Sequence, residues 1–98
     1  MKNVPFLDLN QQIQRVKDEI FIEINNLVNK NDFIQGSYLD KFENSFSKLY
    51  GISHCAGVSS GTSALFLALK ASGIQEGDEV ITTPATFFAT GEAIINCG

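Results

Sequence analysis

The feature that most constrains the fold is an alternation of short apolar segments over residues 54–83. The segment HCAGVS (54–59) is small and apolar like a buried strand, TSALFLALKASG (62–73) predicts a helix, and the β-branched run VITT (80–83) predicts a second strand. Pro84 closes this last run and favours an extended conformation for the residue before it. Strand, helix and strand in this order predict a βαβ unit with a right-handed crossover and a parallel sheet, so we expect an α/β fold.

The residues before this alternation carry a helical pattern instead. Residues 3–9 predict an extended arm, because Pro5 opposes an early helix. Asp8 or Asn10 is placed to cap the helix that follows. Apolar residues then recur every three or four positions, as in an amphipathic helix: Ile13, Val16, Ile20, Ile24, Leu27 and Val28.

A second helix is predicted from about Tyr38 to Tyr50, after a break at 29–32 and the short connector FIQG at 33–36. Gly51 stands in the position that commonly ends a helix. The apolar face of this helix would consist of Leu39, Phe42, Phe46 and Leu49.

A third helix is predicted from residue 87, and the sequence closes on INCG. Two strands alone do not make a stable parallel sheet. We therefore expect the 98 residues to be the amino-terminal part of one larger domain. Within it, residues 1–53 would form an arm and helices, and residues 54–98 the start of an α/β cofactor domain.

Charge and composition exclude several classes of partner. The net charge of −4 argues against binding to a nucleic-acid backbone, which needs a clustered basic face. The start of the chain lacks the apolar core of a signal peptide, and no run approaches the ~20 apolar residues of a membrane span. Cys55 and Cys97 lack CxxC spacing and, with His54 alone, make no metal set. We expect two reduced thiols, a cytoplasmic location, and neither a metal nor a membrane partner.

The segment SSGTSAL (59–65) lies at the junction of a predicted strand and a predicted helix. Such a junction points backbone N–H groups outward at the positive end of the helix dipole, where a phosphate is stabilised without a lysine. Gly61 would let the anion approach the backbone, and Thr62 and Ser63 would add hydroxyl donors. An ordinary helix cap has the same composition, so both interpretations stay open. The spacing matches neither GxxxxGK[ST] nor GxGxxG.

An aromatic pair follows the second predicted strand in TTPATFFAT (82–90). In a parallel sheet the loops at the carboxyl ends of neighbouring strands lie side by side, and ligands bind there. Phe87 and Phe88 would then lie near the anion site, which suits a flat, phosphorylated ring. Burial of both rings in the core is the alternative.

Five segments, in this order, resemble the start of the DegT/StrS family of fold-type I aminotransferases: VPFLDL, FIQG, KFENSFSKLYGISHCAGVSSGTSALFLAL, GIQEGDEVITTPATFFAT and AIINCG. Enzymes of this family use pyridoxal 5'-phosphate and mostly aminate nucleotide-linked keto sugars. The resemblance implies that Gly61, Thr62 and Ser63 bind the cofactor phosphate and that Phe87 stacks on the pyridine ring. It also implies a mainly parallel sheet in the large domain.

For the remaining parts of the site, the resemblance implies substrate contacts at Phe6 and at Ile34 and Gly36. The family's catalytic lysine, its aspartate on the pyridine nitrogen and a further phosphate-binding serine would all come after residue 98. No residue here is therefore assigned a catalytic role, and Lys70 is expected on a solvated helix face.

The implied activity is transfer of an amino group, with glutamate as donor, to a nucleotide-linked keto sugar by a full-length homodimer. The 98 residues alone are expected to be inactive. One alternative is a sugar dehydratase of the same family that uses the same cofactor. Another is a non-catalytic regulatory or binding protein with this α/β fold, and in the plainest version SSGTSAL is only a helix cap.

Overall fold

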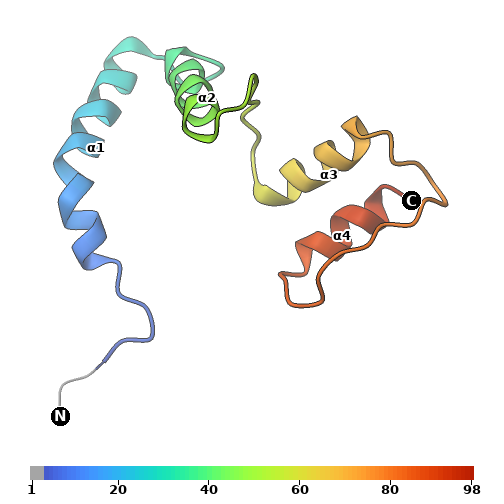
Figure 1. Ribbon diagram of the computed structural model, residues 1–98. Coiled ribbons are helices and arrows are strands. Elements are labelled where there is room, and N and C mark those ends of the chain that lie inside the picture. Colours follow the sequence, from blue (N-terminus) through green and yellow to red (C-terminus); the bar gives the residue numbers. More distant parts are fainter. Residues whose placement is uncertain (1–3) are drawn as a thin grey trace. The chain divides into compact units, whose positions relative to one another are not determined.

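A computed structural model describes residues 4–98, and the regular structure in this range is entirely helical (Figure 1). Two compact units divide the chain, one over the described residues up to Cys55 and one over Ala56–Gly98. The first holds two helices and the second holds two more. Their bounds are α1 Asn10–Lys30, α2 Ser37–Tyr50, α3 Gly61–Ala71 and α4 Ala89–Asn96.

Helix α1 follows the predicted amphipathic pattern and extends it at both ends. Asp8 Oδ1 accepts a hydrogen bond from Asn10 N at 2.9 Å, which satisfies one N–H at the start of the helix. At the other end Asn31 adopts a left-handed conformation with φ 54°, which asparagine tolerates better than most residues. The N–H groups of Asn31 and Asp32 then bond back to the carbonyls of Val28 and Leu27. This arrangement ends the helix.

Helix α2 begins and ends at polar or glycine signals visible in the sequence. The Asp32 carboxylate accepts hydrogen bonds from Ser37 N at 3.0 Å and Ser37 Oγ at 2.6 Å. Gly51 confirms the predicted stop, because it takes the left-handed conformation with φ 65°. Its N–H bonds to the Lys48 carbonyl. Between the helices of this unit, Tyr38 donates a hydrogen bond to Glu23 Oε2 at 2.9 Å.

The second unit has an apolar contact between its helices. Helices α3 and α4 lie side by side, and the buried residues of the described chain all come from α4 and its end (Figure 1). These are Ala89, Ala93 and Cys97, spaced four apart on one helix face. Lys70 is exposed, as expected, but its amine reaches the end of α4 and donates to the Cys97 carbonyl at 3.1 Å.

The predicted βαβ unit is wrong for this structure. Residues 54–59 and 80–83 contain no strand, and none occurs elsewhere between residues 4 and 98. An extended segment becomes a strand only when its N–H and C=O groups pair with a neighbour, and a two-stranded pair is marginal by itself. The side chain of Ile81, in the second predicted strand, is fully exposed. Only the helix of the predicted unit forms, as α3 Gly61–Ala71.

Candidate functional site

The start of α3 is a capped helix end with a cluster of serine hydroxyls. Ser60 is extended, and its Oγ accepts from Ser63 N at 3.1 Å, the usual geometry of an N-cap. The Oγ of Ser63 in turn hydrogen-bonds to Ser60 Oγ at 3.0 Å and to Ser59 Oγ at 3.2 Å. The helix-cap interpretation is therefore correct for Ser60. A cap occupies only part of the helix end, because the first four N–H groups have no partner within the helix.

A cavity of about 510 Å³ opens at this helix end. It is lined by four residues of α3 and three residues around the start of α4: Gly61, Thr62, Ala64, Leu65, Phe87, Ala89 and Thr90. The structure thus brings together three of the four residues predicted for the cofactor. Ser63 is not among the lining residues, since its hydroxyl points to Ser59 and Ser60. The volume falls in the range of small-molecule sites.

Two lining residues leave room for a ligand. A Cβ built on Gly61 would meet no atom within 4 Å, so packing within the described chain does not require glycine there. Because glycine has no side chain, an anion can reach the backbone N–H groups at this point directly. The Phe87 ring is 80% exposed and therefore has a face free of protein. Phe88 is 76% exposed but does not line the cavity, so the alternative of two core rings is wrong for this structure.

Thr90 also lines the cavity and was not predicted. Its Oγ1 lies 2.9 Å from Thr86 Oγ1, and its N–H donates to the Phe87 carbonyl at 3.1 Å. The two threonines are four residues apart and flank Phe87, the spacing of neighbours on one helix face. That spacing is a signal the sequence contained.

The residues predicted to contact substrate belong to the first unit and line neither described cavity. Phe6 is fully exposed and Ile34 is 86% exposed. Gly36 precedes α2, and a Cβ there would overlap the Asp32 carboxylate that caps the helix. Local packing therefore accounts for glycine at this position.

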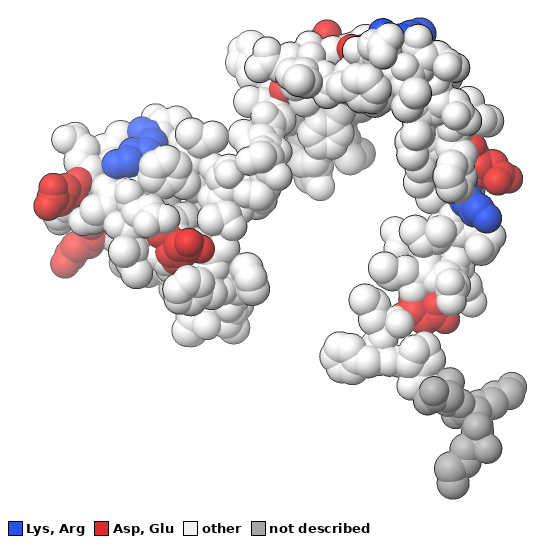
Figure 2. All heavy atoms as spheres, turned by 180° about the vertical axis from the view of Figure 1, so that it is seen from behind, with Lys and Arg blue, Asp and Glu red and all other residues white. Residues whose placement is uncertain are grey.

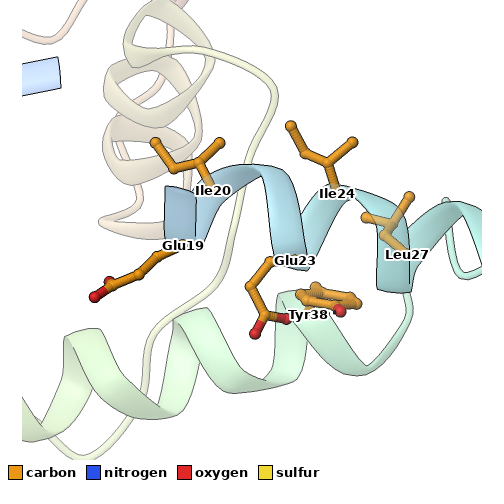
Figure 3. A pocket seen from close by; sticks show the side chains of 6 residues that line it. All are labelled: Glu19, Ile20, Glu23, Ile24, Leu27 and Tyr38. Atoms are coloured by element: carbon orange, nitrogen blue, oxygen red, sulfur yellow. Dashed lines mark hydrogen bonds between the residues drawn. The ribbon is translucent and has the colours of Figure 1, made fainter. Parts of the chain in front are cut away.

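A second cavity, of about 390 Å³, lies along α1 (Figure 3). Its walls are Glu19, Ile20, Glu23, Ile24, Leu27 and Tyr38. Partial desolvation, the hydrogen bond to Glu23 and the negative charges of Glu23 and Asp32 raise the pKa of Tyr38 above its ordinary value. Figure 3 shows the Glu23 carboxylate beside the Tyr38 ring, so the polar end of this mostly apolar cavity is already paired.

Side chains that could bind a metal ion, and basic side chains that could bind a large anion, do not cluster in the described residues. Between residues 4 and 98, no three His, Cys, Asp or Glu side chains lie close enough to hold a metal ion. On the face drawn in Figure 2, Lys and Arg side chains are scattered among uncharged and acidic ones. No helix in the described range combines the length and hydrophobicity needed to cross a bilayer.

Comparison with known proteins matches residues 14–98 to the DegT/DnrJ/EryC1/StrS aminotransferase family. A "Pleiotropic regulatory protein" of Geobacillus stearothermophilus is 40% identical over 98% of this chain and 26% of its own length. The UDP-N-acetyl-3-dehydro-alpha-D-glucosamine 3-aminotransferase of Acidithiobacillus ferrooxidans is 39% identical over 97% of the chain and 26% of its own length. The spore coat polysaccharide biosynthesis protein SpsC of Bacillus subtilis is 50% identical over 65% of the chain and 16% of its own length. The chain thus spans about a quarter of the length of the first two relatives.

Proposed function

The chain belongs to the DegT/DnrJ/EryC1/StrS aminotransferase family, and from that premise we propose that it forms part of a pyridoxal-phosphate-dependent enzyme that aminates a nucleotide-linked keto sugar. Names of relatives support the substrate class. One is the aminotransferase of a UDP-linked 3-dehydro sugar, and another is a dTDP-3-amino-3,6-dideoxy-alpha-D-galactopyranose transaminase of Aneurinibacillus thermoaerophilus. Glutamate as amino donor, a homodimer and a cytoplasmic location belong to the same proposal and rest on the family resemblance.

The observation that carries the proposal is the cavity where the start of α3 faces Phe87. The N–H groups of Gly61 and Thr62 would hold the phosphate of pyridoxal 5'-phosphate at the positive end of the helix dipole. The exposed face of Phe87 would lie against the pyridine ring. When bound, the cofactor supplies an electron sink for chemistry at the amino-bearing carbon.

The residues of this chain bind and orient in this proposal; none donates or accepts a proton in the reaction. Ser63 stays in the proposed cofactor set through the N-terminal turn, because its hydroxyl joins Ser59 and Ser60 at the helix start where the phosphate would bind. Phe6, Ile34 and Gly36 remain proposed substrate contacts. For Gly36 this role would come in addition to its fit against Asp32.

The test is a titration of the full-length protein with pyridoxal 5'-phosphate. Thr62→Val with Ser63→Ala removes the Thr62 hydroxyl from the cavity and the Ser63 hydroxyl from the adjoining turn. A hydrogen bond to a charged group is worth ~1.5–3 kcal/mol before the remaining N–H donors compensate. We expect cofactor affinity to fall at least tenfold, the equivalent of about 1.4 kcal/mol. Ser72→Ala, at the opposite end of α3, is the matched control and should bind like the wild type. Unchanged affinity in the double variant would remove both hydroxyls from the site.

A second candidate function is regulation without catalysis. It is favoured by one observation, the name "Pleiotropic regulatory protein" of the Geobacillus stearothermophilus relative. The two candidates separate in an assay of the full-length protein with glutamate and a panel of nucleotide-linked keto sugars. Formation of an amino sugar supports the enzyme. Cofactor binding without turnover of any sugar supports the regulatory protein.

A further inference from the structure

The turn that carries Phe87 is held by two hydrogen bonds in which Thr90 takes part. Thr90 N donates to the Phe87 carbonyl at 3.1 Å, and Thr90 Oγ1 lies 2.9 Å from Thr86 Oγ1. The backbone bond fixes the residue on which the ring is mounted. The hydroxyl bond joins Thr86, directly before Phe87, to Thr90, three residues after it. Together they close residues 86–90 into one turn.

This turn lacks the usual support at a helix start. The N-cap position of α4 is Phe88, whose side chain cannot accept a hydrogen bond. The helix is only eight residues long, so its first turn is a large part of it. The hydroxyl bond between Thr86 and Thr90 is the side-chain hydrogen bond that spans this start.

Orientation of the Phe87 ring therefore depends on its backbone. The side chain is 80% exposed, and a ring with so little packing is not held by neighbouring side chains. A mobile aromatic wall loses entropy when a ligand orders it, which weakens binding. A backbone fixed on both sides of the ring reduces that cost.

We infer that Thr90 is a positioning residue for the cofactor, acting through Phe87 by its hydroxyl bond to Thr86. The inference rests on the proposed function, because it assigns Thr90 to the cavity where pyridoxal 5'-phosphate would bind. Thr90 itself supplies no charge and needs no direct contact with the cofactor. Its role is to hold the backbone that carries the ring, and so to fix the point beside the cavity from which the ring projects toward a flat ligand.

The experiment uses the full-length protein and three variants. Thr90→Val removes the hydroxyl and keeps the side-chain shape, Thr90→Ser keeps the hydroxyl, and Thr86→Val removes the other end of the bond. Affinity for pyridoxal 5'-phosphate is measured by titration. The visible circular dichroism of the bound cofactor reports how the cofactor ring is oriented in the cavity. A melting curve of each variant reports general stability.

We expect Thr90→Val to bind the cofactor about two- to tenfold more weakly, the effect of one neutral hydrogen bond, with a reduced visible dichroism band. Thr86→Val should do the same, and the double variant should be no worse than either single one, because both remove the same bond. Thr90→Ser should restore both readouts. A lowered melting temperature with unchanged affinity and dichroism in Thr90→Val would overturn the inference. So would an effect of Thr90→Val that Thr86→Val does not reproduce.

A readout without cofactor separates this inference from the proposed function. Phe87→Trp introduces a fluorescent side chain at the position in question, and the emission of the same protein with Phe87 in place is subtracted. The starting protein is the Phe87→Trp variant without cofactor. Adding Thr90→Val to it should lower the fluorescence anisotropy of the introduced side chain, and adding Thr90→Ser should leave the anisotropy unchanged. If the wild type binds no pyridoxal 5'-phosphate, the proposed function fails while this measurement still decides on the bond. Equal anisotropy in all three backgrounds would show that the bond does not hold the ring.

Discussion

The α1–α2 unit and the α3–α4 unit hold their helices in different ways. In the first, polar contacts join the elements, namely Tyr38 to Glu23 and Asp32 to Ser37. No residue of α1 or α2 is buried, and large apolar side chains such as Phe42, 54% exposed, remain open. In the second, small residues of α4 are buried in contact with α3, and the cavity opens beside this contact.

The difference shows that length and amphipathicity do not decide where a core forms. Helix α1 has 21 residues and a clear apolar stripe, but burial requires a partner surface. Helix α4 has eight residues, yet its alanines and Cys97 allow close approach to α3. Packing should therefore dominate the effects of substitutions in the α3–α4 unit, and capping and polar contacts those in the α1–α2 unit.

The largest effect is expected from Ala93→Leu in the α3–α4 contact. Ala93 is 0% exposed, so the larger side chain must push the helices apart or adopt a strained rotamer. We expect the free energy of unfolding of the full-length protein to fall by about 1–3 kcal/mol, measured by denaturant titration. Ala68→Leu, on an exposed position of α3, is the matched control and should change stability by less than about 0.5 kcal/mol. Equal effects of the two would mean that this contact is not a core.

A smaller effect is expected from Gly36→Ala in the α1–α2 unit. The added Cβ would displace the Asp32 carboxylate and remove the cap of α2, at a cost of about 0.5–2 kcal/mol in unfolding free energy. In an Asp32→Ala background the cap is already lost, so Gly36→Ala should then cost far less. The comparison is made by denaturant titration of the four proteins. Additive costs would argue that Gly36 has a role unrelated to Asp32.

The smallest effect is expected from Tyr38→Phe, and it depends on pH. The pKa of Tyr38 is raised in the folded protein from its ordinary value of 10.0, so the folded state holds the phenol proton more tightly. The resulting stabilisation is present below pH 10 and is lost as pH rises through the folded pKa. The stability of the wild type relative to Tyr38→Phe, taken from melting curves, should be highest below pH 10 and should fall as the pH rises through the folded pKa. A wild-type stability that rises relative to Tyr38→Phe in alkali would give the shift the opposite sign.

The sequence predicted the helices well, because periodicity and stop signals are local. The three-and-four spacing found α1 and α2, and Gly51 marked the end of α2. It predicted two strands wrongly, since small or β-branched runs indicate extended backbone but do not show whether a neighbour pairs with it. Ile81 illustrates this: residues 80–83 form no strand, and its side chain is fully exposed.

The candidate site was predicted in part for the same reason. Gly61, Thr62 and Phe87 line one cavity because the start of α3 and the loop before α4 are each set by local signals. That the Ser63 hydroxyl lies against Ser59 and Ser60 depends on the side-chain rotamers of the three serines, which composition does not encode. The fit of Gly36 against Asp32 depends on a fold-back across four residues that no spacing rule indicates.

The central claim is that the cavity beside α3 binds pyridoxal 5'-phosphate against Phe87 and not against its neighbour. Phe87 and Phe88 are nearly equally exposed, at 80% and 76%, and only Phe87 lines the cavity, so they form a matched pair. The most direct measurement is a titration of full-length Phe87→Ala and Phe88→Ala with pyridoxal 5'-phosphate, followed by the absorbance of the bound cofactor. The account predicts that Phe87→Ala binds about tenfold more weakly with a shifted band, from the loss of aromatic contact, and that Phe88→Ala binds like the wild type. Equal losses in both variants, or a loss confined to Phe88→Ala, would contradict it.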